Sequence, residues 1–260
     1  MKYIALTFDD GRSDNYLLAK RIMDKYQFCG TVYITTGFID GTWEDKDVLQ
    51  SPTRPLTIKE INALHSSGWE IGLHGDKHKI QKDDMRIAID KLQSWGITNR
   101  RWGISVPNSS VSEIEIRDLL ESEYGGEIVY IRRGRKCNTA KLKNKVLYVL
   151  YSVLKSKLAY RSFNAENVFL YSREDRSNIP SVVVKSNDRA ELVIDFIKTL
   201  PNDSVVVLML HSILSSDHAM CGKDPWSWDE ENFEILCSSL KDLADNNDLQ
   251  VKTLMEILKG

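Results

Sequence analysis

The sequence predicts an α/β fold, a (β/α)7-type barrel that is closed or nearly closed and forms one domain over residues 1–260. Three observations predict it. Strand-like and helix-like segments alternate about seven times along the chain. The strand-like segments are almost continuously apolar, which is typical of parallel strands covered by helices. Several of them end in an acidic or imidazole side chain, and barrel enzymes carry their chemistry at strand ends. An open, doubly wound sheet is the alternative.

Each expected element has its own signal in the sequence. Apolar and β-branched runs predict strands at residues 3–8, 30–35, 69–73, 102–106, 128–131, 205–210 and 249–251. Apolar residues at helical spacing predict helices at residues 14–26, 57–66, 83–95, 112–123, 189–200 and 230–246. Thr57 and Glu60 form a capping-box pattern at the start of one helix, and Gly96 closes the next. Thr253 is expected to cap a final helix.

One segment departs from this alternation. Residues 128–165 contain ten basic residues and no acidic one, so the rest of the chain carries a net charge of −12. We expect an insertion at about residues 136–165 with a basic helix, whose apolar stripe comprises Leu142, Val146, Val149, Leu150, Val153, Leu154 and Leu158. Two interpretations are open. The segment is an inserted helix packed on the barrel, or it forms a basic amphipathic surface that meets anionic lipid or an anionic substrate.

Composition narrows the class of protein. The net charge of −2 gives no general attraction to nucleic acid. None of the four cysteines lies in a Cys-x-x-Cys pair, which argues against a zinc knuckle and favours free thiols. No apolar run is long enough to span a bilayer. The first expected strand begins at about Lys2 with no signal-peptide pattern before it, so we expect a cytoplasmic protein.

Five side chains at expected strand ends suggest a one-metal hydrolase: Asp9, Asp10, His74, His78 and His211. Asp10, His74 and His78 supply one oxygen and two imidazole nitrogens, a set that suits zinc first and also cobalt, manganese or iron. Adjacent carboxylates point to opposite faces of an extended strand. Asp9 and Asp10 therefore reach one site only if the strand ends in a turn, which Gly11 allows. One of the two carboxylates would then bind metal while the other acts as general base, and His211 would protonate the leaving amine.

The order of these residues is similar to that of a known family. Thr7-Phe8-Asp9-Asp10-Gly11, His74-x-x-x-His78 and Leu208-Met209-Leu210-His211 resemble the first, second and last motifs of the polysaccharide deacetylase family, also called NodB-like or carbohydrate esterase family 4. The resemblance implies a distorted (β/α) barrel, one divalent metal ion and an N-acetylated sugar or glycan substrate. It assigns Asp9 as base, His211 as acid, and Asp10, His74 and His78 as metal ligands.

The sequence also departs from the family's motifs. Gly75 stands where the second motif usually has Ser or Thr. The third motif usually reads Arg-x-Pro-Tyr, and the best match here is Ser105-Val106-Pro107-Asn108, which lacks the Arg that orients the base. Arg132 or Arg133, at the end of the next expected strand, is a candidate replacement. The fourth motif, Asp-x-x-Asp-Trp, has no clear counterpart.

Further residues are expected near the substrate. Pro107 and Asn108 are expected to contact it from the third motif's position. Trp226 and Trp228 lie in an expected loop, where aromatic faces either stack on sugar rings or pack over the barrel edge. Asp76 would either orient a ligand histidine or remain a solvated loop residue.

Three functions compete. The first is a metal-dependent N-deacetylase acting on an acetamido sugar, with a soluble saccharide, a nucleotide sugar or a lipid-linked glycan precursor as substrate. The second is hydrolysis of another amide or a small ester on the same fold. The third is a catalytically inactive protein that binds a glycan, which the missing Arg and the missing fourth motif favour. All five groups tied to metal and proton transfer are present, and this observation favours the first.

Overall fold

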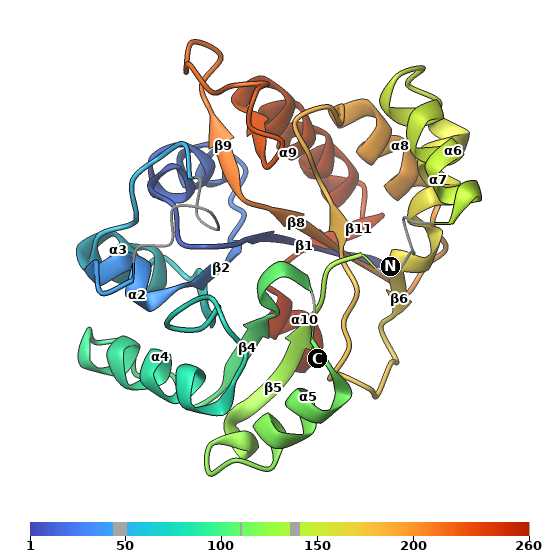
Figure 1. The fold of residues 1–260 in the computed structure, drawn as a ribbon. Helices are drawn as coiled ribbons and strands as arrows, with labels where there is room; N and C mark the ends of the chain where they lie inside the picture. The colour runs from blue at the N-terminus through green and yellow to red at the C-terminus, as the bar shows by residue number, and fades with distance from the viewer. Residues whose placement is uncertain (44–50, 110, 136–140, 260) are drawn as a thin grey trace.

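Seven parallel strands form the barrel in the computed structural model, which describes residues 1–43, 51–109, 111–135 and 141–259 (Figure 1). They are β1 (Lys2–Phe8), β2 (Thr31–Ile34), β3 (Glu70–Leu73), β4 (Trp102–Ser105), β5 (Ile128–Arg132), β7 (Val182–Val183) and β8 (Ser204–Leu210). β8 pairs with both β7 and β1. Ile131 on β5 exchanges backbone hydrogen bonds with Arg176 and Ile179, just before β7. The predicted (β/α)7-type barrel is confirmed, and its distortion lies at this irregular β5–β7 seam.

Four further strands lie outside the barrel ring. β6 (Val168–Leu170) pairs antiparallel with β8, and β11 (Leu249–Val251) pairs with the start of β1. β9 (Ser212–Leu214) and β10 (Ser227–Asp229) form a separate parallel pair. β6, β7, β9 and β10 were not predicted; with two or three residues each they are too short to show a period, and of the equally short strands described only β11 was predicted, from its apolar residues.

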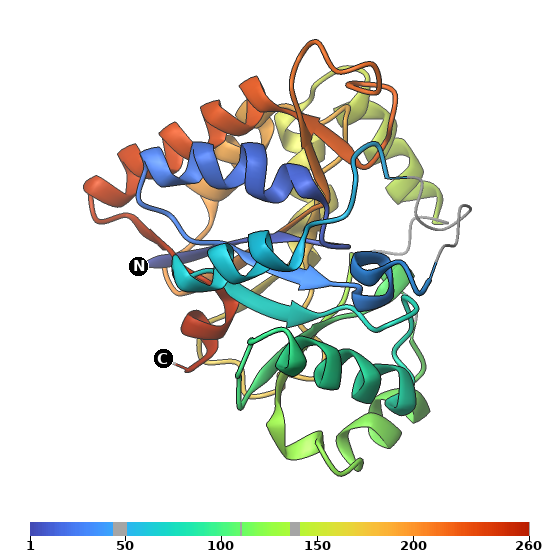
Figure 2. The same cartoon turned by 90° about the vertical axis from the view of Figure 1, so that its left-hand side faces the viewer.

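Helices pack around the strands, as Figure 2 shows. They are α1 (Arg21–Lys25), α2 (Thr36–Asp40), α3 (Ile58–Ser66), α4 (Lys82–Ser94), α5 (Glu113–Leu120), α6 (Leu142–Ser152), α7 (Lys157–Asn164), α8 (Ala190–Thr199), α9 (Glu230–Asp245) and α10 (Leu254–Lys259). The expected helix at 14–26 begins as a π-helical segment over Asn15–Lys20 and continues as α1. The capping box of Thr57 and Glu60 is confirmed at the start of α3.

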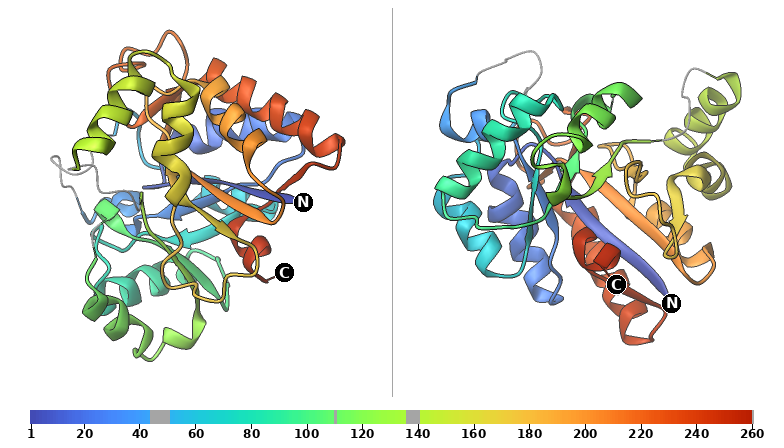
Figure 3. Two further views of the ribbon diagram at one scale, coloured as in Figure 1. Left: turned by 90° about the vertical axis from the view of Figure 1, so that its right-hand side faces the viewer. Right: turned by 90° about the horizontal axis from the view of Figure 1, so that it is seen from below.

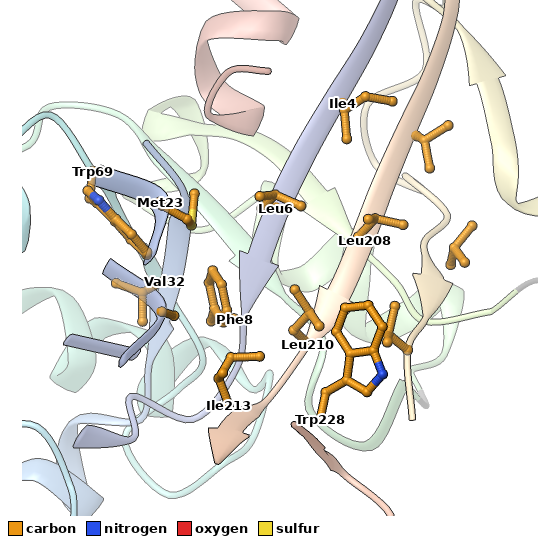
Figure 4. Packing of buried hydrophobic residues seen from close by; sticks show 14 of the residues in the cluster. Ile4, Leu6, Phe8, Met23, Val32, Trp69, Leu208, Leu210, Ile213 and Trp228 are labelled. Carbon is orange, nitrogen blue, oxygen red and sulfur yellow. The ribbon is translucent and has the colours of Figure 1, made fainter. Parts of the chain in front are cut away.

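The side chains of the strands separate into two cores by the period of two. Ile4, Leu6 and Phe8 face the helices and join the larger core, where Figure 4 shows them alongside Leu208 and Leu210 of β8. The residues between them point into the barrel. A smaller core fills this interior with Ala5, Tyr33, Tyr130, Phe169, Ile179, Val205 and Val207, together with side chains of α10. The barrel interior is therefore packed and forms a floor beneath the strand ends.

The expected insertion is two helices rather than one. α6 ends at Ser152, and α7 begins after Ser156, whose side chain accepts a hydrogen bond from the Ala159 N–H as the cap. A single stripe through Leu158 is therefore wrong, because the chain turns between the two helices and Lys155 adopts a positive φ of 54°. Residues 136–140, at the expected start of the insertion, lie outside the described residues.

The composition predicts free thiols and no apolar run long enough to span a bilayer. Among the described residues Cys29, Cys221 and Cys237 are free thiols, while Cys137 lies outside them. No helix in the described part of the chain has both the length and the apolar character needed to cross a membrane.

A buried carboxyl before α8 predicts a pH-dependent stability. Asp188 accepts a hydrogen bond from the Lys185 N–H, and burial raises the pKa of its carboxyl to about 6. A raised pKa means that stability is lost as pH rises from about 4 through about 6. In Asp188→Asn this loss is absent. We expect the variant to gain about 2–3 kcal/mol on wild type between pH 4 and pH 8, measured by urea unfolding. An equal difference at both pH values would contradict the prediction.

Candidate metal centre and active site

The period of two that fills the barrel interior also aims the candidate site residues inward. Asp9 lies four residues after Ala5 on β1, and His211 lies four after Val207 on β8. Arg132 follows Tyr130 on β5 in the same way. Asp9 and Arg132 are buried, and His211 is partly buried. The strand parity therefore gathers groups from distant parts of the sequence over the apolar floor.

A turn after β1 brings the second carboxylate into the same site. Asp10 has a φ of +75° and Gly11 a φ of +81°, so the extended strand ends at Phe8. Because the strand ends in this left-handed turn, Asp9 and Asp10 no longer have to point to opposite faces, as expected from Gly11. Asp10 then faces His74 and His78, which lie at the end of β3 and in the loop that follows it.

The spacing of these three groups fits a divalent metal ion. Asp10 Oδ1 lies 3.5 Å from His74 Nε2 and 3.6 Å from His78 Nε2, and the two imidazole nitrogens are 3.1 Å apart. Tetrahedral zinc with ligands at about 2.1 Å requires ligand atoms about 3.4 Å apart. The three ligand atoms are all buried and close together. Asp10, His74 and His78 would therefore hold the metal through one oxygen and two nitrogens.

The loop around His74 is shaped for this orientation. His74 Nδ1 lies 2.8 Å from the Ser105 carbonyl oxygen, which makes Nδ1 the donor and leaves the Nε2 lone pair facing Asp10 and His78. Gly75 has a φ of +81°, and a Cβ there would collide with the Lys79 backbone and with the Asp84 carboxylate. The family's usual Ser or Thr does not fit this turn.

Arg12 is a site residue that the sequence analysis missed. Its guanidinium is buried, donates from Nε to Asp10 Oδ2 at 3.0 Å, and places Nη2 2.8 Å from the same oxygen. Its Nη1 donates to Ser212 Oγ at 3.0 Å. Asp10 thus has one oxygen occupied by Arg12 and the other facing the two histidines. An arginine after Asp-Asp-Gly looks like a surface turn residue, so no local signal identified it.

Arg132 occupies the role left open by the altered third motif. Arg132 Nη2 donates to both oxygens of Asp9, at 2.5 and 2.6 Å, and also to Ser105 Oγ. Ser105 Oγ donates to Asp9 Oδ2 at 3.2 Å. Arg132 therefore reaches the Asp9 carboxylate from β5, the strand that follows β4 and the altered third motif. Arg133 lies apart, in an ion pair with Glu113 at 3.0 Å, and so does not reach Asp9.

These contacts set the charge states of both carboxylates. Burial raises the pKa of Asp9, but the Arg132 guanidinium, His74 and His211 together lower it below its ordinary value. Burial also raises the pKa of Asp10, yet Arg12 and the hydrogen bond with His74 hold it well below that value. Both groups are therefore carboxylates at neutral pH, which a metal ligand and a proton acceptor require.

Burial decides the protonation state of the imidazoles of His78 and His211. It lowers the pKa of His78 to about 4, and the neighbouring His74 adds to this effect. It likewise lowers the pKa of His211 to about 4, although Asp10 and Asp9 oppose the shift. Both imidazoles are neutral at pH 7. The His211 Nδ1 atom has no hydrogen-bond partner among the described residues, so the partner sought in a fourth motif is not present there.

The two tryptophans of the predicted loop have different environments. The ring of Trp226 is partly exposed and lies 4.8 Å from that of His211, in keeping with a substrate contact. Trp228 is in β10 and buried in the core, where its Nε1 donates to the Asp188 carbonyl at 2.8 Å. The expectation that Trp228 contacts substrate is wrong, because packing removes it from the surface. Trp43, which was not predicted, lies 6.0 Å from the His78 ring.

Three residues near the site, Asp76, Pro107 and Asn108, differ in their burial. Asp76 is buried and pairs with Lys91 at 2.7 Å while accepting from Thr36, so it braces the loop and is neither solvated nor bonded to a histidine. Pro107 is buried, and Asn108 is exposed with a φ of +54°. The structure shows no contact that joins Pro107 or Asn108 to the metal ligands, and their role at the substrate stays a prediction.

Comparison with protein families points to one description. The model of the family described as polysaccharide deacetylase matches residues 1–117, which include both carboxylates and both ligand histidines. Arg132 and His211 lie beyond the matched residues. No curated protein matches the chain.

Solved structures are similar to the chain over almost its whole length. A family 4 acetyl xylan esterase from Clostridium thermocellum in complex with a cobalt ion is 17% identical, with 99% of this chain and 90% of that chain covered and a TM-score of 0.50. A putative polysaccharide deacetylase from Mycobacterium smegmatis is 12% identical, with 99% and 89% covered and a TM-score of 0.52. A mutant of BA3943, a CE4 family pseudoenzyme, is 10% identical, with 98% and 67% covered and a TM-score of 0.51. At these identities the likeness shows the fold alone.

Proposed function

We propose that this protein, whose residues 1–117 match the model of the polysaccharide deacetylase family, is a metal-dependent hydrolase that removes an N-acetyl group from an acetamido sugar or glycan precursor. One observation carries the proposal. The ligand atoms of Asp10, His74 and His78 converge at metal-binding distances, and two ionisable groups, Asp9 and His211, lie beside them. A carbohydrate deacetylase needs this combination of a metal site, a proton acceptor and a proton donor.

The donor set supports a divalent cation, with zinc as the first candidate and cobalt, manganese or iron as others. Bound there, such an ion would supply Lewis-acid polarisation of the acetyl carbonyl and would acidify a water molecule. Asp10 contributes one oxygen to it, because Arg12 holds the other at 2.8–3.0 Å. His74 is fixed in the required tautomer by the Ser105 carbonyl oxygen.

The remaining residues of the site would transfer the protons. Asp9, held as a carboxylate by Arg132, accepts a proton from the attacking water. The water oxygen forms a bond to the acetyl carbon, and the bond from that carbon to the sugar nitrogen breaks. The proton that Asp9 took from the water passes through His211 to the leaving nitrogen, which returns both side chains to their starting states. The products are acetic acid, which ionises to acetate, and the free amino sugar. The Trp226 ring, beside His211, is placed to stack on a sugar ring.

The direct test is to load the purified protein with zinc, cobalt or manganese and to measure acetate release from a panel of N-acetylated sugars. Release that needs added metal and stops with a chelator supports the proposal. If metal binds but no acetamido sugar releases acetate, while a formyl, ureido or acetyl ester substrate is cleaved, hydrolysis of another bond on the same fold replaces it. If no metal binds at all, a glycan-binding protein without turnover becomes the better explanation.

Arg132 and Arg133 provide a matched pair for testing the third-motif replacement. We expect Arg132→Ala to lower kcat at least about a hundredfold, because a buried Asp9 loses its ion-pair partner. Since Arg132 lowers the pKa of Asp9, the acid limb of the pH–rate profile should move to higher pH. Arg132→Lys should restore part of the activity, and Arg133→Ala should resemble wild type. An unshifted pH profile in Arg132→Ala would show that Arg132 does not act through Asp9.

A further inference from the structure

Large aliphatic side chains gather on the outer surface of the two inserted helices. Leu142, Val146 and Val149 on α6, with Val153 at its C-cap, are all exposed, from 50% for Val146 to 78% for Leu142. We call these four residues the aliphatic patch; Leu154 and Leu158, which follow them in the chain, are exposed as well. Exposed leucine and valine side chains in such number on one helical pair are unusual for a surface that only water covers.

The patch results from how α6 is attached. Leu142, Val146, Val149 and Val153 follow the spacing i, i+4, i+7 and i+11, which places them on one side of the helix. The opposite side carries buried Tyr151, whose ring lies 5.2 Å from that of Phe163 on α7. α6 therefore packs through its aromatic side and presents its aliphatic side outward. The inserted helix α6 thus packs on the rest of the molecule, and Leu150 of the predicted stripe contacts the core, while the other six stripe residues are exposed.

Lysines border the stripe on both sides. At about 100° per residue, Lys143 lies about 100° to one side of Leu142 and Lys145 about 60° to the other. Both are exposed, and neither forms an ion pair with an acidic group in the described part of the chain. Three lysines, counting Lys141, stand at the positive end of the α6 dipole, and the first turn has no acidic residue. This arrangement is locally unfavourable and would be relieved by negative charge from outside the molecule.

A cationic pocket adjoins the patch on the side of the candidate site. It has a volume of about 400 Å³ and is lined by Arg135, Asn144, Lys145, Tyr148, Val149 and Lys185. Buried Asp188 lies near Arg135 and Lys185 and offsets part of their charge. Lys185 Nζ lies 4.4 Å from the Trp226 ring, which in turn lies 4.8 Å from the His211 ring. Positive charge thus extends from the patch to the edge of the candidate site.

The position of the patch suits contact with a surface. In Figures 2 and 3, α6 lies at the outer edge of the molecule, on the side to which the carboxyl ends of the barrel strands point. The candidate site lies at those same strand ends. A flat partner that touched α6 would therefore lie near the opening of the site.

We propose that the aliphatic patch and its bordering lysines dock this protein on an anionic lipid surface. The aliphatic side chains enter the boundary between head groups and acyl chains, and the lysines meet lipid phosphates. A second copy of the chain is a poorer partner, because it would bring lysines against lysines. In combination with the proposed function, on which this step rests, docking would present the site with an acetamido sugar anchored to lipid through an anionic group that enters the cationic pocket.

The test is binding to vesicles by sedimentation, with phosphatidylglycerol in phosphatidylcholine compared with phosphatidylcholine alone. We expect binding to the anionic vesicles that weakens with salt. Leu142→Ser combined with Val153→Ser should weaken it at least about tenfold. Lys143→Gln and Lys145→Gln should each weaken it about fivefold. A matched control, Ile114→Ser with Leu170→Ser, changes exposed aliphatic residues away from the patch and should bind like wild type.

The outcomes separate docking from catalysis. The proposal is overturned if anionic vesicles do not bind, if the patch variant binds like wild type, or if the patch instead mediates a dimer that the same substitutions abolish. Acetate release from a soluble acetamido sugar, measured without vesicles, should be equal in wild type and the patch variant. If the patch variant loses vesicle binding but keeps wild-type acetate release, the result supports docking independently of catalysis. If the wild-type protein binds vesicles but releases no acetate, only the proposed function is contradicted.

Discussion

Replacing His74 by alanine is expected to remove both the metal ion and the activity. His74 Nε2 lies 3.5 Å from Asp10 Oδ1 and 3.1 Å from His78 Nε2, so the variant leaves two of three ligands. Two ligands hold a divalent ion far more weakly than three, and we expect about one ion per wild-type chain and almost none in the variant after dialysis. Activity should fall at least about a thousandfold. Metal analysis of the purified proteins measures the first effect and acetate release the second.

His65 supplies a matched control for this experiment. It lies on α3, is partly exposed, and is not among the residues that could hold the metal. His65→Ala should therefore keep both metal and turnover, while thermal unfolding shows whether either variant has lost its fold. If His74→Ala retains a full complement of metal, the ligand set proposed above is incorrect, whatever the activity proves to be.

Asp9→Asn is expected to separate catalysis from metal binding. The three metal ligands stay in place, so the metal content should equal that of wild type. Turnover should fall by about a hundredfold to ten-thousandfold, because an amide cannot take the proton from water that a carboxylate takes. Arg132 can still donate to the amide oxygen, which preserves part of the local geometry.

The control for Asp9→Asn is the same change at Asp83, an exposed residue in the first turn of α4. Asp83→Asn should leave turnover unchanged. Circular dichroism and unfolding of Asp9→Asn are needed as well, since the substitution removes the charge partner of buried Arg132. A well-folded, metal-loaded Asp9→Asn protein that keeps its activity would exclude Asp9 as the base.

Local sequence patterns were enough to identify most of the barrel. The β1 and β8 strands are long and apolar, and both were predicted within about a residue of their observed bounds, because burial on both faces leaves a continuous signal. The capping box at Thr57 likewise marks α3. β7 has two residues and β9 three, too short for any period, and only their pairing with neighbouring strands defines them.

The residues of the candidate site also divide into those that a local sequence signal identified and those that it did not. Asp9, Asp10, His74, His78 and His211 could be selected from sequence because each follows a buried strand or the loop after it. Arg12 and Ser105 could not, since a polar residue in a turn or at a strand end has many ordinary explanations. Trp228 was misassigned for a related reason. Its short strand gave no period, so burial in the core could not be foreseen.

The sequence alone determined the barrel class and the identity of the groups available for metal binding and proton transfer, because strand parity and residue chemistry are local properties. The tertiary structure decided which side chains contact one another and which face solvent. It selected Arg132 over Arg133 for Asp9 and turned the aliphatic side of α6 outward although an amphipathic pattern usually marks a buried face. Such choices depend on distances between residues far apart in the chain, and no spacing within one segment encodes them.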